Sequence, residues 1–388
     1  GMDIGALYVA LTCAFAYVSG ASLNPTISLA FIAQGRRELR NRGLDAVDCV
    51  VAAVCQVGAS VMATVVYGTL VPLSSAPAPT DREMHILNPT QLRDGIRLRD
   101  WRLPFSATLM PFVDADPENA SYGIMGRGEL QSASLEAAAG CVAFSCALVL
   151  VHLNTVHDQP GNGFSGLAIG LTVLGGVLAF GDLATGLFNP ALPLGLYIGK
   201  LIVGNPFHWL DLLGVLLLAL LPFVGGLLAV LANSFNANPD KPAVLVTEFV
   251  GSFFLVLCLL KAPGSTGLVY VGLIYFGAHV SHAHYNPAVT LSHHLAGKCS
   301  LEVLWRYALV QTGGAMLAGA MALSEGDALP LADPEATPLV IASVECLVSF
   351  AIILVHLNVL GERDFSLGGT TSLHAARPTN DHYGIAVG

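Results

Sequence analysis

The four residues Tyr285-Asn286-Pro287-Ala288 have two close counterparts elsewhere in this chain, and all three phrases end apolar runs rich in small residues. The counterparts are Leu23-Asn24-Pro25-Thr26 and Phe188-Asn189-Pro190-Ala191. Asparagine is favoured directly before a helix, and proline suits the first turn, where its missing N–H would have had no partner. Helix-forming apolar residues follow each phrase. Each phrase therefore predicts the start of a helix.

These predicted helix starts lie between residues as apolar as a membrane interior. Irregular backbone at bilayer depth is tolerated only inside protein or along a water-filled cavity, because lipid cannot satisfy its polar groups. Half-helices whose N-termini point at a shared site near the midplane are typical of channels and transporters. The three phrases thus point to membrane transport before any other feature is considered.

The composition supports an integral membrane protein. The chain has 388 residues, of which 54% are hydrophobic and 11% charged, and its mean hydropathy is +0.66. Apolar runs long enough to span a bilayer recur at 46–72, 134–153, 208–232, 246–262 and 338–359. They are continuous and do not alternate with period two, so we predict an all-α, multi-pass membrane protein and not a barrel.

Charge and cysteine content exclude several other functions. The formal net charge is −10, from 17 basic and 27 acidic residues, and no basic face suggests a nucleic-acid partner. The eight cysteines lie mostly within apolar runs without metal-type spacing, which is typical of small buried hydrophobic residues. No segment combines a nucleophile, a base and oxyanion donors. We therefore expect no enzyme, no metal and no cofactor.

The chain also repeats itself over longer stretches. Val18–Asn24 is similar to Val280–Asn286, and Val151-His152-Leu153-Asn154 is similar to Val355-His356-Leu357-Asn358. Repetition of this kind sets the domain count. We predict a first unit over 1–232, called the first copy, a linker over 233–244, and a second unit over 245–388, called the second copy.

Two polar segments interrupt the first copy. The arginine-rich cluster of residues 36–42 lies in a short loop and marks the cytoplasmic side of the membrane. Residues 73–132 form the longest polar segment, and loops of that length are often functional.

The string from Gly277 to Leu291 resembles the first half-helix signature of the aquaporin (major intrinsic protein) family, with His282 where a glycine is usual. That resemblance implies six tilted helices and two half-helices that form an inverted repeat around a narrow pore. Residues 3–232 look like helices two to six of one such bundle, and 245–388 like helices one to four of another. Because apolar runs stand at both ends of the chain, we expect a tandem double aquaporin trimmed at both ends.

The resemblance implies a passive channel for water or small neutral solutes across a lipid bilayer. The amides of Asn24 and Asn189 would donate to passing molecules, and each half-helix N-terminus carries a partial charge of about +0.5 that repels protons and cations. The second copy contains only Asn286 of such a pair. Family members usually assemble four pores around an axis, so a tetramer-like homo-oligomer is expected.

The selectivity constriction implied for the first copy consists of Ile4, Val177, Gly186 and Leu192. Leu192 stands where the family usually has an arginine, and Pro193 stands where its glycerol channels usually have an aspartate. An apolar ring can pass small neutral solutes such as glycerol, urea or ammonia, or it can dewet and conduct poorly. We favour passage of solutes.

Four polar side chains on the predicted transmembrane helices are candidate site residues. Glu248 and Glu345 are functional-site candidates by default, but we expect them to accept hydrogen bonds from the irregular backbone before a half-helix instead of carrying ions. Gln56 and Gln311 lie beside glycines, and we expect them to bond across helices.

Histidines gather around the third phrase, at positions 279, 282, 284, 293 and 294. Satisfied polar contacts are the preferred interpretation, ahead of a pH gate or a metal site. His152 and His356 are expected to cap the C-terminal ends of their helices as cations.

Two other functions stay open on sequence alone. A secondary transporter also uses broken helices and inverted repeats, but it needs ion ligands at the midplane. A non-conducting membrane scaffold would result if Leu192 closed the pore mouth.

Overall fold

The computed structural model is helical wherever it describes the chain, and it contains no strand within those residues. It describes residues 2–34, 46–70, 127–157, 163–184, 188–202, 207, 209–236, 241–324 and 337–359. The arginine cluster at 36–42, Gly186, and most of the predicted loop at 73–132 lie outside these residues. The fold class predicted from sequence, an all-α membrane protein, is confirmed.

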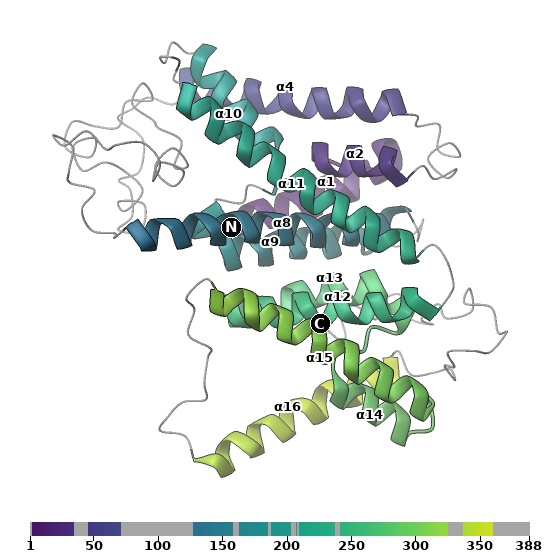
Figure 1. Cartoon of the computed structure of the whole chain (residues 1–388). Coiled ribbons are helices and arrows are strands. Elements are labelled where there is room, and N and C mark those ends of the chain that lie inside the picture. Colours follow the sequence, from purple (N-terminus) through teal and green to yellow (C-terminus); the bar gives the residue numbers. More distant parts are fainter. Residues whose placement is uncertain are drawn as a thin grey trace. The chain divides into compact units, whose positions relative to one another are not determined.

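The helices of the first copy include two short ones, α2 and α10, that follow Asn-Pro phrases (Figure 1). In chain order they are α1 (Met2–Ser19), α2 (Pro25–Gln34), α4 (Ala46–Leu70), α8 (Arg127–His152), the π-helix η5 (Leu153–His157), α9 (Ser165–Ala184), α10 (Ala191–Ile202) and α11 (Trp209–Asn236).

The helices of the second copy include one short helix after a phrase, α14. In chain order they are α12 (Lys241–Lys261), the 3-10 helix η6 (Pro263–Ser265), α13 (Thr266–Ser281), α14 (Pro287–Leu295), α15 (Leu301–Ser324) and α16 (Pro338–Val359).

Within the described residues, five helices are long and apolar enough to cross a membrane, and they match the five apolar runs of the sequence. Their spans are Ala46–Val66, Ala138–Val156, Val215–Ser234, Ala243–Lys261 and Pro338–Asn358. Two predicted boundaries differ. Helix α8 already begins at Arg127, inside the predicted loop, because Glu129, Leu130 and the alanines that follow favour helix despite their polar neighbours. The predicted linker 233–244 also contributes residues to α11 and α12.

The chain folds into two compact units, each built from segments that are distant in sequence. Compact unit 1 comprises Gly1–Ser22, Cys146–Gly186 and Leu227–Gly388, and compact unit 2 comprises Leu23–Ser145 and Leu187–Gly226. These units reflect packing, whereas the two copies reflect repetition of sequence. The copy boundary near residue 240 therefore stays a prediction.

Helices in compact unit 2 meet at small residues. Gly195 and Gly199 of α10 lie directly against Ser60 and Thr64 of α4, so the two backbones approach closely. Gly226 of α11 faces Thr26 of α2 in the same manner. Small residues let membrane helices gain packing contacts where lipid offers no hydrophobic driving force.

Compact unit 1 uses the same device. Gly166 and Gly170 of α9 lie against Val9 and Cys13 of α1, and Gly314 of α15 lies against the backbone of α12 at Phe249. Helix α12 packs between α13 and α15. Helix α16 contacts α14 but leaves nearly all of its apolar span exposed.

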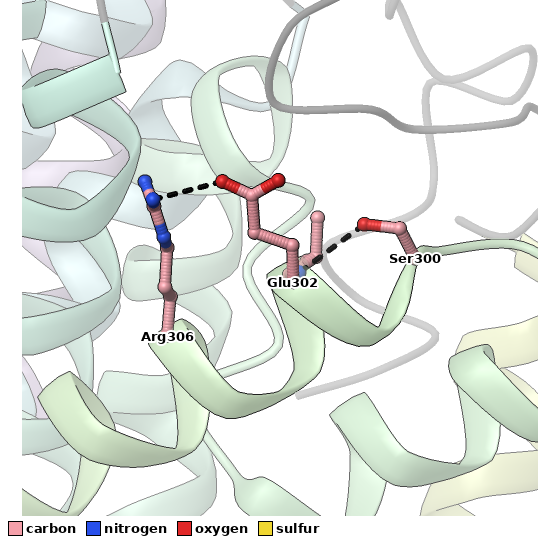
Figure 2. A network of polar contacts seen from close by, with 4 residues as sticks. Ser300, Glu302 and Arg306 are labelled. Atoms are coloured by element: carbon pink, nitrogen blue, oxygen red, sulfur yellow. Dashed lines mark hydrogen bonds and ion pairs between the residues drawn. The ribbon is translucent and has the colours of Figure 1, made fainter.

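The start of α15 is fixed by local polar contacts, shown in Figure 2. Ser300 precedes the helix, and its Oγ accepts a hydrogen bond from the N–H of Val303 at 3.3 Å. Glu302 in the first turn pairs with Arg306 one turn later, at 2.8 Å between Oε1 and Nη2. Serine caps and acidic residues in the first turn both favour a helix N-terminus. Glu302 is exposed and Arg306 is half-buried, so solvent screens the pair and its contribution to stability is small.

The close approach of α10 to α4 predicts an asymmetry between two glycines. We expect Gly195→Val to lower the thermal unfolding midpoint in detergent, because its Cβ would overlap Ser60 and overpacking destabilises by about 1–3 kcal/mol. Gly58→Val on α4 is the matched control, since a Cβ there meets no heavy atom within 4 Å. Equal midpoints for the two variants would contradict this packing.

Candidate functional site

Asn24 and Asn189 are joined by a reciprocal pair of hydrogen bonds within compact unit 2. The Asn24 Nδ2 donates to the carbonyl of Phe188 at 2.8 Å, and the Asn189 Nδ2 donates to the carbonyl of Leu23 at 3.0 Å. Each asparagine thus bonds to the residue immediately before the other one. Asn24 is 1% exposed and Asn189 is 9% exposed. Two phrases separated by more than 160 residues therefore meet at one place.

The same two side chains also cap their own helices. The Oδ1 of Asn24 accepts from the N–H of Thr26 at 2.9 Å, and the Oδ1 of Asn189 accepts from the N–H of Ala191 at 3.0 Å. An asparagine side chain is favoured at this position because it satisfies an N–H that has no partner within the helix. One amide group therefore holds its own helix start and ties that start to the opposite one.

This arrangement brings two helix N-termini, those of α2 and α10, to a common point. Each N-terminus carries a partial charge of about +0.5 from its aligned peptide dipoles. No acidic residue lies in the first turn of either helix. The point where the two N-termini meet is therefore electropositive, although the first turns of α2 and α10 contain no charged side chain.

The third phrase has the same local geometry but a different setting. The Oδ1 of Asn286 accepts from the N–H of Ala288 at 2.8 Å and so caps α14. Asn286, Pro287 and Ala288 are all exposed, unlike Asn24. No second Asn-Pro helix start of the second copy is present among the residues that the structure describes.

Glu248 of α12 supports the backbone that leads into α14. Its Oε1 accepts from the Ser281 hydroxyl at 2.6 Å and from the His284 N–H at 3.0 Å. Its Oε2 accepts from the Tyr285 N–H at 2.7 Å and from the Gln311 Nε2 at 2.8 Å. The carboxylate is fully buried. Its four acceptor contacts are the compensation that a buried polar group needs.

Glu345 differs from Glu248, although both lie within apolar helices. Glu345 is exposed on α16, whose span packs little against the rest of the described structure. Burial therefore separates two carboxylates that have similar sequence surroundings.

The two predicted glutamines each contact the half-helix of their own copy. Gln56 of α4 exchanges contacts with Ser28 of α2, with Nε2 to Oγ at 3.2 Å. Gln311 of α15 donates to the Thr290 hydroxyl of α14 at 3.0 Å. Ser28 and Thr290 each lie four residues after the phrase asparagine. The contacts across helices have the same pattern in both copies.

The four residues of the predicted constriction do not come together in one described unit. Ile4 of α1 and Val177 of α9 belong to compact unit 1, whereas Leu192 of α10 belongs to compact unit 2. Ile4 and Leu192 are both more than a third exposed. The constriction stays a prediction.

His152 and His356 do not cap their helices as cations, contrary to our prediction. Both rings are fully buried, and their Nε2 atoms reach the carbonyls of other segments: Ala21 for His152 and Ala283 for His356, both at 3.2 Å. Burial removes the solvent that a cationic cap needs, so the rings serve as donors to a distant carbonyl. In the sequence, the only indication that these two histidines have a common role is that both lie in a Val-His-Leu-Asn string.

Sequence reasoning missed the contribution of hydroxyl groups to the same region. The Ser252 Oγ donates to the carbonyl of Tyr285 at 3.0 Å, and the Tyr307 hydroxyl donates to the carbonyl of Ser281 at 3.0 Å. Tyr285 in turn fills a slot beside Gly251 and Gly277, where a larger residue would overlap its ring. No spacing in the sequence links these residues. Within the described part of the chain, no group of three His, Cys, Asp or Glu residues is arranged to hold a metal ion.

The structure contains helices that begin on asparagine caps within an apolar bundle, and two of these helix starts face each other. This arrangement defines a class of polytopic membrane protein with re-entrant half-helices. Comparison with known proteins agrees. Residues 262–327 match the Major intrinsic protein family. Aquaporin NIP1-1 of Arabidopsis thaliana is 34% identical over 92 residues, which is 20% of this chain and 31% of that protein. Aquaporin NIP1-4 of Oryza sativa subsp. japonica is 36% identical over 90 residues, or 19% and 33%.

Residues 262–327 are thus similar to the major intrinsic protein, or aquaporin, family, and the apolar helices support a multi-pass membrane protein. The matched region spans about a third of the length of these relatives. No solved structure matches the chain at a comparable level.

The buried contacts of Glu248 predict a strong effect of removing its charge. We expect Glu248→Gln to lower the thermal unfolding midpoint in detergent. The new amide nitrogen would face a donor, and an unsatisfied buried polar group destabilises by about 1–3 kcal/mol.

Glu345→Gln is the matched control, because Glu345 also lies within an apolar helix but is exposed. Its midpoint should stay near that of the unmodified chain. A drop as large as that of Glu248→Gln would show that the contacts of Glu248 do not hold this region.

Proposed function

We propose that the chain is a passive channel for water and small neutral solutes, with its pore at the paired asparagines of the first copy. The observation that carries this proposal is the reciprocal bonding of Asn24 and Asn189, with Nδ2 to carbonyl distances of 2.8 Å and 3.0 Å. The names of its relatives, aquaporins, support the same function.

The chemistry of an amide group suits weak, repeated binding of neutral molecules. Each NH2 group has two N–H donors, and the Asn24 contact with Phe188 uses one of them. The second is proposed to donate to the oxygen of a passing water or solute. Apolar neighbours offer no competing site, so binding is weak and transport is fast.

Proton exclusion follows from the same geometry. A cation or a hopping proton at the junction of α2 and α10 meets two partial positive charges of about +0.5 each. It would also lose its hydration without gaining a counter-ion, which is costly in an apolar interior. A water molecule oriented with its oxygen towards the amides interrupts a chain of proton transfers. A neutral solute experiences neither penalty.

We further propose that Leu192 widens the solute range of the channel. This residue follows the second phrase, where a fixed cation is usual in the family, and an apolar side chain there lacks the charge and donors of arginine. The ring formed with Ile4, Val177 and Gly186 would then admit small neutral solutes such as glycerol, urea or ammonia.

The repeated contacts favour a tandem arrangement of two aquaporin-like copies, over 1–232 and 245–388. Three contacts recur in both copies: the asparagine cap, the glutamine contact with the hydroxyl four residues after the phrase asparagine, and the histidine contact with the alanine carbonyl three residues before it. The first copy contains two phrases and is the proposed conducting unit. A tetramer-like homo-oligomer is proposed on family grounds.

A secondary transporter is the less favoured function. It would need a ligand set for a coupling ion near the half-helices. The buried carboxylate available there, Glu248, already accepts four hydrogen bonds from protein groups.

The paired asparagines give a direct test. We expect Asn24→Ala to reduce the osmotic water permeability of proteoliposomes containing the full chain to that of protein-free liposomes, because both the cap and the bond to Phe188 are lost. Permeability is measured by stopped-flow light scattering after a sucrose shock.

Asn286→Ala is the matched control, since it removes an equivalent cap from a half-helix that lacks a described partner. It should leave permeability unchanged. If Asn286→Ala abolished conduction while Asn24→Ala did not, the pore would have to be assigned to the second copy. A saturating, ion-dependent flux would favour a transporter. An absence of flux in the unmodified chain would favour a scaffold.

The role of Leu192 predicts a change of selectivity. We expect Leu192→Arg to reduce glycerol and urea permeability while water permeability persists, because a guanidinium narrows the mouth and supplies donors that water can use. Leu192→Met keeps the size and polarity and should retain both. The measurement compares swelling rates in gradients of each solute. Unchanged glycerol flux in Leu192→Arg would place Leu192 outside the pore.

A further inference from the structure

The described residues with an unusual backbone gather before two of the half-helices. Among the residues that the structure describes, all five non-glycine residues with positive φ lie there: Ala21 and Leu23 before α2, and His282, Ala283 and Tyr285 before α14, with φ between 45° and 65°. L-residues rarely adopt this left-handed conformation. It persists only where the surrounding contacts over-determine it. Specific contacts must therefore hold the backbone before each of these half-helices.

Residues 282–285, here called the left-handed segment, are held by side chains from several helices. Glu248 of α12 accepts from two of its N–H groups, and Ser252 of α12 donates to the carbonyl of Tyr285. A further contact comes from α16, where His356 Nε2 lies 3.2 Å from the carbonyl of Ala283. Without His356 this carbonyl would lose its side-chain partner.

The direction of that hydrogen bond fixes the state of the ring. A carbonyl oxygen accepts and cannot donate, so the Nε2 of His356 must carry the proton. The other ring nitrogen, Nδ1, lies 2.9 Å from the Nε2 of His293 on α14. A single proton lies between these two nitrogens. One ring of α16 is therefore bonded both to the segment before α14 and to α14 itself.

The two contacts of His356 hold the chain on both sides of the start of α14. Ala283 lies three residues before Asn286, and His293 lies seven residues after it. Because both bond to His356, α14 cannot shift along its axis without breaking one of the two bonds. All three rings, those of His284, His293 and His356, are buried and lie within 5.4 Å of one another between centroids.

The first copy has half of this arrangement. His152 Nε2 lies 3.2 Å from the carbonyl of Ala21, which is three residues before Asn24. Seven residues after Asn24 stands Phe31, which has no nitrogen in its ring. Histidine therefore contacts the same carbonyl in both copies, and only the second copy adds a contact to the half-helix.

A capping role for His356 is weaker on the same observations. The carbonyl of Leu357, at the end of α16, already accepts from the Lys298 ammonium at 3.1 Å. His356 is fully buried, and its Nε2 lies 3.2 Å from the carbonyl of Ala283, outside its own helix. A cation is thus supplied to the helix end by Lys298.

We propose that His356 is a positioning residue that clamps the left-handed segment and α14, and that His152 is its counterpart at Ala21. Each donates an Nε2–H to the alanine carbonyl three residues before the phrase asparagine. The clamp in the second copy is reinforced by His293. The proposal rests on the proposed channel function in one respect: that function explains why the half-helices must be held in place. The hydrogen bonds of His356 and His152 do not depend on it.

The first test is spectroscopic and uses the unmodified full chain in detergent micelles. Nitrogen-15 NMR of selectively labelled histidine, assigned with His152→Gln and His356→Gln, reports which ring nitrogen carries the proton. We expect the Nε2–H form at both residues, and a coupling of His356 Nδ1 to the proton shared with His293. A protonated Nδ1 with a bare Nε2 at either residue would overturn the proposal.

The second test compares substitutions by amide hydrogen exchange of residues 284 and 285. His356→Leu keeps an apolar side chain but cannot donate, so exchange should become about tenfold faster, as expected when one buried hydrogen bond is lost. His356→Gln places an amide donor near the position of Nε2 and should restore exchange to near its original rate. Rescue by glutamine separates donation from simple packing.

His294→Leu is the matched control, because His294 also contacts a carbonyl, that of Cys299 at 2.9 Å, but lies outside the clamp. Exchange at residues 284 and 285 should not change. Equal rates in His356→Leu and the unmodified chain, or failure of His356→Gln to rescue, would overturn the proposal. Neither the NMR nor the exchange measurement requires conduction. An absence of water flux would therefore contradict the proposed channel function, whereas the role of His356 is decided by these two measurements.

Discussion

The structure depends on one constraint: a helix that starts inside an apolar bundle exposes backbone N–H and C=O groups that lipid cannot satisfy. In the first copy the two interrupted segments satisfy each other, since Asn24 and Asn189 each donate to the residue before the other. In the second copy side chains from neighbouring helices do so, with Glu248 accepting and Ser252 and His356 donating. Both solutions fix the direction in which a half-helix N-terminus points.

Close helix packing makes these polar contacts possible. Glycines at the crossings of α4 with α10, of α1 with α9 and of α12 with α15 bring backbones close together. Buried donors and acceptors must lie within about 3 Å of each other, and side chains as short as serine and asparagine reach that distance only when the helices are close. The buried polar contacts therefore depend on the small residues that let the helices approach each other.

Much of the local structure was predictable from sequence. The five apolar spans and the helix starts at the three phrases follow from interactions within a few residues, and the structure contains all of them. The histidines show where prediction stopped. His152 is 131 residues from Ala21, and a histidine near a helix end fits a cationic cap equally well on sequence alone. Only its burial and the direction of its ring exclude that role.

The sequence by itself determined the class of protein and the positions at which helices begin, because hydrophobicity and the capping preference of Asn-Pro act locally along the chain. Tertiary structure alone decided which asparagines pair and which intramembrane carboxylate is buried. Glu248 and Glu345 have similar apolar neighbours, yet one accepts four hydrogen bonds inside the bundle and the other lies exposed on α16. The physical reason is that burial depends on the helices packed around a residue, and residues close in sequence do not contain that information.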